Sequence, residues 1–153
     1  MKYRTFIVQE PNERLHRVCK NVTSFKEARE IAEKLIQVTR KVDGIFKPWL
    51  GMSAPQVGFN KRVIVLKEST DNYIVMINPE VAKQKWNLPI LSRCFSLKGI
   101  YIIKSPYWME VRYQDLEGRN HQKIIKGPKV ATLMQEINHI NGILISEIGI
   151  KLL

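Results

Sequence analysis

Two segments with a helical period bracket a run of short strand-like segments, and this order limits the folds that the chain can adopt. Apolar residues recur at helical spacing over residues 25–42, where Ser24 and Glu27 form a capping-box signal. A second helix is predicted over residues 128–141, with proline at its start and Gly142 at its end. The order of helix, several strands and helix is typical of an α+β domain with largely antiparallel strands.

The strand-like segments are short and are separated by turn-forming residues. Strands are predicted at 62–67, 73–77, 80–85, 99–103, 109–113 and 121–125. Asn78-Pro79 separates the second strand from the third, and Glu117-Gly118 predicts a hairpin between the last two. A chain of 153 residues is long enough for one hydrophobic core and shows no linker-like tract. We therefore expect a single domain over residues 1–153.

The composition excludes several classes of protein. Hydrophobic residues make up 44% and charged residues 25% of the chain, which is typical of a folded globular domain rather than a disordered one. No apolar run approaches the ~20 residues that a membrane-spanning helix needs. The N-terminus resembles neither a signal peptide nor a transit segment. These features lead us to expect a cytoplasmic protein with no membrane partner.

The chain is strongly basic. It has 25 Lys and Arg residues against 14 Asp and Glu, a net charge of +11. Such a charge attracts phosphate backbones and acidic surfaces without sequence specificity. The basic residues form no recognised nucleic-acid motif, so we expect no specific nucleic-acid partner. Cys19 and Cys94 are too few to suggest a disulfide scaffold, and reduced thiols are expected.

The second predicted helix carries a variant of a metallohydrolase motif. In H-E-x-x-H, two histidines four residues apart share one helix face and bind zinc, and the glutamate is the general base. Gln135-Glu136-Ile137-Asn138-His139 keeps the glutamate and the second histidine. Gln135 replaces the first histidine with a neutral amide, whose oxygen is a poorer ligand for such metals than an imidazole nitrogen.

Three segments together resemble the motifs of the peptide deformylase family. Leu-Gly-Met-Ser-Ala-Pro-Gln-Val-Gly at 50–58 resembles its first motif, G-x-G-L-A-A-x-Q. Arg-Cys-Phe-Ser at 93–96 resembles E-G-C-L-S, and residues 135–139 resemble H-E-x-D-H. Residues 7–15, with a proline and an Arg-Leu pair, are also similar to the start of the family. The resemblance covers nearly the whole chain and implies an α+β, peptide deformylase-like fold, with antiparallel sheets packed around the motif helix.

The resemblance implies a metal-dependent hydrolase that removes the formyl group from the N-terminal methionine of nascent peptides. The positions that match metal ligands are Cys94, His139 and, with the ligand type changed, Gln135. Glu136 matches the general base and acid, and the groups that match oxyanion donors are Gln56 and the backbone N–H of Phe95. Gly51 matches a backbone contact to the peptide, beside Trp49. The implied cofactor is a divalent metal, iron, zinc or nickel, held substoichiometrically because of Gln135.

Further departures from the family pattern leave alternatives open. Asn138 stands in place of aspartate, Ser92 and Arg93 in place of glutamate and glycine, and Trp49 in place of the first glycine. The site is therefore either a weak deformylase or an inactive homologue that binds peptide N-termini or a ribosome-associated partner, attached near ribosomal RNA through its basic surface. Two further hypotheses are a Cys94 thiolate activated by neighbouring cations and His121 as a substitute ligand.

Overall fold

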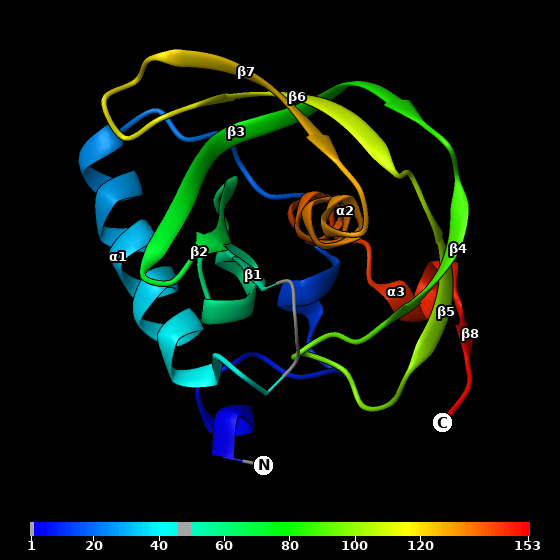
Figure 1. Cartoon of the computed structure of the whole chain (residues 1–153). Helices are drawn as coiled ribbons and strands as arrows, with labels where there is room; N and C mark the ends of the chain where they lie inside the picture. Colours follow the sequence, from blue (N-terminus) through cyan, green and yellow to red (C-terminus); the bar gives the residue numbers. More distant parts are fainter. Residues whose placement is uncertain (1, 46–49) are drawn as a thin grey trace.

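The computed structural model describes residues 2–45 and 50–153 (Figure 1). The helices are α1 (Phe25–Val42), α2 (Lys129–Ile140) and α3 (Ile145–Ile148), with single 3-10 turns η1 (Lys2–Thr5), η2 (Glu13–His16) and η3 (Ala54–Val57). The strands are β1 (Gly51–Ser53), β2 (Val63–Ser69), β3 (Asn72–Lys85), β4 (Leu88–Ser92), β5 (Tyr101–Ser105), β6 (Trp108–Gln114), β7 (Asn120–Lys126) and β8 (Ile150–Lys151).

The strands form two antiparallel sheets around α2. The larger sheet has the order β1-β2-β3-β6-β7, and the smaller has the order β4-β5-β8. In Figure 1, α2 lies in the centre with strands curved around it, and α1 lies on the outside of the larger sheet. Helix α2 contacts β1, β2 and β7 of the larger sheet and β5 of the smaller one. The α+β fold, with antiparallel sheets packed around the motif helix, is confirmed.

Helix α1 begins and ends where the sequence predicts. The Ser24 hydroxyl accepts a hydrogen bond from the backbone N–H of Glu27 at 3.3 Å, which satisfies one of the free donors at the helix start. Gly44, just beyond the last turn, has a φ of +88°. The apolar stripe of α1 is buried against the larger sheet at Ala28, Ile31, Leu35, Val38 and Val42. Burial of this stripe holds the helix in place.

The predicted break between strands at Asn78-Pro79 is wrong, because β3 runs through it. The register with β6 shifts between Ile77 and Glu80, so the irregular position bends the strand without ending it. Asn78 has a φ of +51°, and its side chain bonds to the backbone of Val22. Its Oδ1 accepts from Val22 N at 2.8 Å, and its Nδ2 donates to Val22 O at 3.1 Å. A local turn signal is thus accommodated inside a long strand.

Helix α2 is buried on nearly every side, more than an amphipathic pattern requires. The larger sheet covers its apolar stripe at Val130, Leu133, Ile137 and Ile140. Gln135, Glu136 and His139 on the other side are also buried, with exposed fractions of 8%, 3% and 1%. Buried polar groups need partners, so this side of α2 is where the site is found. No helix in the described part of the chain has the length and hydropathy to cross a membrane.

Candidate functional site

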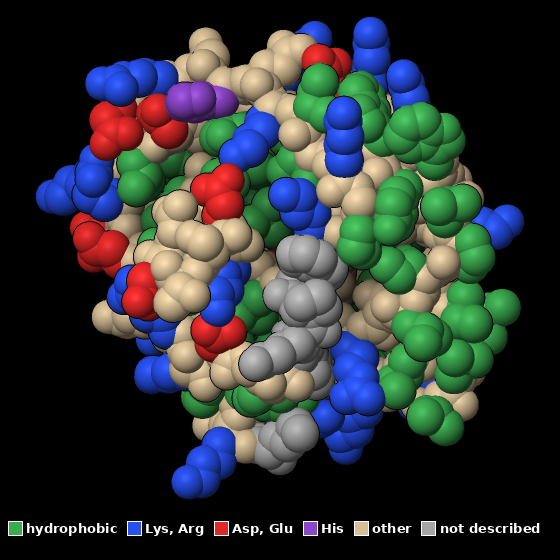
Figure 2. Space-filling model, in the orientation of Figure 1, with side chains coloured by type: hydrophobic (Ala, Val, Ile, Leu, Met, Phe, Trp, Pro, Cys, Tyr) green, Lys and Arg blue, Asp and Glu red, His purple; other side chains and the backbone are tan. Residues whose placement is uncertain are grey.

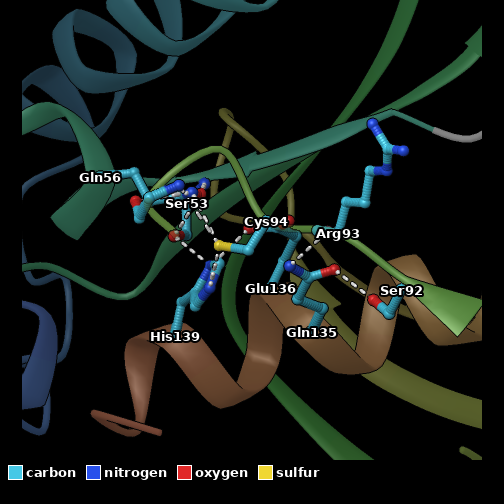
Figure 3. A network of polar contacts seen from close by, with 9 residues as sticks. Ser53, Gln56, Ser92, Arg93, Cys94, Gln135, Glu136 and His139 are labelled. Carbon is cyan, nitrogen blue, oxygen red and sulfur yellow. Dashed lines mark hydrogen bonds and ion pairs between the residues drawn. The ribbon is translucent and has the colours of Figure 1, made fainter. Parts of the chain in front are cut away.

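Helix α2 supplies a carboxylate and an imidazole that contact each other. Glu136 and His139 lie three residues apart, on the same side of the helix. Glu136 Oε2 is 3.0 Å from His139 Nδ1, and the Ser53 hydroxyl, at the end of β1, is 3.1 Å from the same nitrogen. Figure 3 shows these side chains converging between α2 and η3. The imidazole is therefore held in one orientation.

The Cys94 thiol completes this cluster from the segment between β4 and β5. Its Sγ lies 3.4 Å from His139 Nε2, on the ring edge opposite Glu136 (Figure 3). The backbone N–H of Ser96 donates to the same sulfur at 3.4 Å, and Gln56 Nε2 lies 3.8 Å away. The sulfur is therefore in contact with an imidazole nitrogen, a backbone N–H and an amide nitrogen. The side chain is almost fully buried, yet it lines the cavity described below.

The charges in the cluster stabilise a proton on His139. Burial alone would lower the pKa of His139, since a charged ring is poorly solvated there. The negative charges of Cys94 and Glu136, and the hydrogen bonds to both, outweigh burial and raise this pKa to about 10. The three groups form one coupled chain in the order thiol, imidazole, carboxylate.

Gln56 is fixed on η3 by both ends of its amide. Its Oε1 accepts from the backbone N–H and the hydroxyl of Ser53, each at 3.1 Å. Its Nε2 donates to the hydroxyl of Ser96 at 3.2 Å. The amide thus links the first sequence motif to the second. Neither serine is singled out by the sequence, and only their place inside the two motifs could have pointed to them.

Gln135 does not join the cluster. Its Nε2 donates to the backbone carbonyl of Arg93 at 3.1 Å, and its Oε1 accepts from the Ser92 hydroxyl at 3.4 Å. Figure 3 shows this amide directed to the end of β4, away from Cys94 and His139. Among the described residues, no group of three His, Cys, Asp or Glu side chains is placed to hold a metal ion. Cys94 and His139 provide two metal donors and do not form a three-ligand site.

A cavity of about 510 Å³ opens beside the cluster. Its walls come from the start of β1, from η3, from β4 and the segment after it, and from α2; they include Leu50, Gly51, Gln56, Ile90, Leu91, Arg93, Cys94, Phe95, Ala131, Thr132, Gln135 and Glu136. Such a mixed apolar and polar lining suits a ligand with an apolar side chain and a polar backbone. His139 lies behind this wall, in contact with Cys94 and Glu136.

The structure brings together most of the residues that the sequence predicts for the site. Gly51, Gln56, Cys94, Phe95 and Glu136 all line the cavity, and Trp49 lies outside the described residues. The hypothesis that His121 replaces the missing ligand is wrong, because its exposed ring on β7 contacts Asp115 at 2.7 Å. Arg93 also lines the cavity, but Figure 3 shows its side chain extending away from the thiol.

A buried thiol, imidazole and carboxylate at the wall of a cleft, on an α+β scaffold, define a hydrolase-like site. The polypeptide deformylase family model matches residues 5–149. The chain therefore belongs to the peptide deformylase family.

Individual relatives agree with this assignment. The chain is 30% identical over 144 residues to the peptide deformylase of Thermosynechococcus vestitus, covering 90% of this chain and 71% of the relative. It is 29% identical to that of Desulforudis audaxviator, covering 90% and 88%. A Plasmodium falciparum peptide deformylase superposes with a TM-score of 0.82 at 30% identity, covering 93% and 85%. The Synechococcus elongatus enzyme in complex with actinonin gives 0.81 at 28% identity, covering 90% and 74%.

Proposed function

We propose that this protein binds the formylated N-termini of nascent peptides in its cavity and hydrolyses the formyl group only slowly. The relatives are named peptide deformylases, and this chain keeps a cavity lined by the family's motif positions. The observation that carries the proposal is the orientation of Gln135, whose amide is bonded to Arg93 O and Ser92 Oγ. The catalytic cluster is retained and the third metal donor is missing.

Each residue of the cluster has a role in this proposal. Gly51 and Phe95 line the cavity. In this proposal Gly51 contacts the peptide backbone, and the backbone N–H of Phe95 donates to the developing oxyanion. Gln56 is the second oxyanion donor. Glu136 accepts and returns protons while it holds His139 through Nδ1.

The metal is where this chain departs from its family. Cys94 and His139 offer one sulfur and one imidazole nitrogen, 3.4 Å apart, and a metal would have to displace the proton that the cluster stabilises on His139. Two protein donors bind iron, zinc or nickel less firmly than the three of an ordinary catalytic site. We therefore expect a divalent metal at well below one equivalent per chain.

The same observation favours a second candidate, a binding protein without turnover. In that case a cytoplasmic homologue would hold peptide N-termini, with the net charge of +11 assisting attachment to ribosomal RNA. The two candidates differ in turnover and share the cavity. Peptide-induced stabilisation would appear in both, since any ligand that binds only the folded state raises the melting temperature.

The test is a metal analysis combined with an assay of formyl-Met peptide hydrolysis. Protein purified without chelator is expected to hold substoichiometric metal and to turn over slowly, and Gln135→His is expected to raise both quantities. Gln135→Leu is the control, because it also breaks the bonds to Ser92 and Arg93 but adds no imidazole. Full metal occupancy with ordinary turnover in the natural chain would overturn the proposal. If Gln135→His raises neither metal occupancy nor turnover, the low activity is instead caused by Trp49, Arg93 or Asn138.

A further inference from the structure

An apolar row crosses the exposed side of the smaller sheet. Leu91 on β4 pairs with Ile102 on β5, and Ile102 pairs with Ile150 on β8. Their exposed fractions are 63%, 37% and 71%, whereas the alternate residues Tyr101 and Ile103 point into the core. Figure 2 shows hydrophobic side chains gathered over these strands. Contiguous exposed apolar side chains of this kind mark an interaction surface, unlike single scattered ones.

The segment that contributes β4 and β5 to this sheet carries basic side chains and no acidic ones. Residues 81–109, which include β4 and β5, contain five Lys and Arg residues and no Asp or Glu: Lys83, Lys85, Arg93, Lys98 and Lys104. Lys104 is opposite Pro89 in the register, so it lies on the same outer face as the apolar row. Within the described part of the chain, Lys98, Lys104 and Lys151 have exposed side chains and make no ion pair. Such lysines attract an anionic partner.

Two amphipathic aromatic residues lie at one corner of the face. Trp86, in the turn between β3 and β4, is 61% exposed, and Tyr107, between β5 and β6, is 38% exposed. The backbone N–H of Tyr107 donates to Lys85 O at 3.0 Å, which places the two turns together. Tryptophan and tyrosine beside lysines and aliphatic side chains are enriched where proteins contact the headgroup layer of a bilayer.

These three observations distinguish between possible partners. A second copy of the chain would oppose one positive face with another, which disfavours a dimer here. RNA would satisfy the lysines but offers nothing apolar to the aliphatic row. An anionic bilayer matches both properties, because lipid phosphates meet the lysines and the acyl boundary meets the apolar side chains. We propose that the outer face of the β4-β5-β8 sheet docks onto an anionic lipid surface.

This inference goes beyond the proposed function and does not depend on it. It also revises the expectation of no membrane partner, because hydropathy tests only for spanning helices. Leu91 and Arg93 belong to the cavity wall as well as to this region, so docking would place the cavity mouth beside the lipid headgroups. A formylated N-terminus emerging close to a membrane would then be within reach of the site.

The test is cosedimentation of the full chain with phosphatidylcholine vesicles, with and without phosphatidylglycerol. Binding is expected with the anionic vesicles alone and should weaken as salt is added. The double variant Leu91→Thr/Ile150→Thr is expected to bind about tenfold more weakly. Ile124→Thr is the matched control, since Ile124 is 50% exposed on β7 of the other sheet.

The charge contribution is tested in the same assay. Lys98→Glu/Lys104→Glu should abolish binding, whereas Lys34→Glu on α1, which lies across the molecule from the smaller sheet in Figure 1, should leave it unchanged. Melting temperatures verify that each variant is folded. Absence of binding to anionic vesicles, or equal binding by the Leu91→Thr/Ile150→Thr variant, would overturn the proposal. So would a dimer that this variant dissociates, or preferential binding of an RNA oligonucleotide through the same lysines.

Discussion

Gly51 allows α2 to approach β1 closely enough to form the site. A Cβ at this position would lie 3.0 Å from Glu136 Cγ, Leu66 Cδ2 and Thr132 Cγ2. Three such contacts are too close for van der Waals packing, so the neighbouring side chains would have to move. We predict that Gly51→Ala lowers the free energy of unfolding by about 1–3 kcal/mol, measured by urea denaturation.

A second substitution separates crowding from other effects at Gly51. Thr132→Ser removes Cγ2, one of the three atoms that the new Cβ would meet. The double variant Gly51→Ala/Thr132→Ser should therefore recover part of the stability lost in Gly51→Ala. If the stability changes of the two single variants simply add up in the double variant, steric contact with Thr132 does not cause the destabilisation by Gly51→Ala.

Site residues could be predicted from the sequence where a motif fixes their place on an element. Glu136 and His139 are three apart on a predicted helix, and their contact at 3.0 Å follows from that spacing. The orientation of Gln135 could not be predicted, because its partners Ser92 and Arg93 lie more than forty residues away in sequence. Only the folded chain brings the end of β4 to α2.

The N-terminal segment and α3 are joined by one histidine. His16 Nε2 is 2.6 Å from Glu10 Oε1, and its Nδ1 is 2.8 Å from Glu147 Oε1 on α3. The hydrogen bond to Glu10, followed by the charges of Glu10 and Glu147, raises the pKa of His16 above its ordinary value of 6.5. The protonated ring therefore links two elements that are distant in sequence.

This link predicts a pH-dependent contribution to stability. The pKa of His16 is higher in the folded chain than in the unfolded chain. Its contribution to the free energy of unfolding is therefore complete below about pH 6.5, as long as the carboxylates stay ionised. The contribution is lost as the pH rises through the pKa of the folded chain. The stability difference between the natural chain and His16→Gln should be about 0.5 kcal/mol near pH 6, since the pair is partly exposed, and should vanish at alkaline pH. Thermal unfolding across pH measures it.

Glu147→Gln tests which contacts cause the effect. Glu10 is the larger cause of the raised pKa, so this variant should weaken the pH dependence without removing it. A pH dependence that is unaffected by His16→Gln would contradict the assignment to this histidine.

Elements could be predicted where local signals and burial agree. Helix α1 has both a cap and an apolar stripe, and its bounds match the prediction. Strands β1 and β8 have three and two residues, too short for any periodicity, and they exist through pairing with β2 and β5. The prediction of a break at Asn78 was wrong because the Asn78 side chain bonds to the distant backbone of Val22. In a turn, an asparagine side chain normally bonds to the backbone of its own neighbours in sequence.

At the scale of the whole molecule, the sequence shows how much charge and apolar surface the chain has, but not where these side chains lie on the folded molecule. The net charge of +11 is evident from the residues alone. The combination of an acid-free stretch with an exposed apolar row depends on the register of β4, β5 and β8, which brings Leu91, Ile102 and Ile150 together. Sheet pairing over long separations is not encoded in any local pattern.

The position of α2 between the sheets predicts that the chain unfolds as one cooperative unit, as a single domain should. Leu133 on α2 is fully buried among Ile64, Met76 and Met109 of the larger sheet, while the same helix contacts β5 of the smaller one.

Leu133→Ala should lower the free energy of unfolding by about 2–5 kcal/mol, because it leaves a cavity. Circular dichroism reports the helices, and Trp86, beside the smaller sheet, serves as the fluorescence probe once Trp49 and Trp108 are replaced by Phe. In that background both signals should shift to the same lower midpoint. Met134→Ala, at a half-buried position on the same helix, should shift both by a smaller amount. Midpoints that separate in Leu133→Ala would instead divide the molecule into two units, one for each sheet.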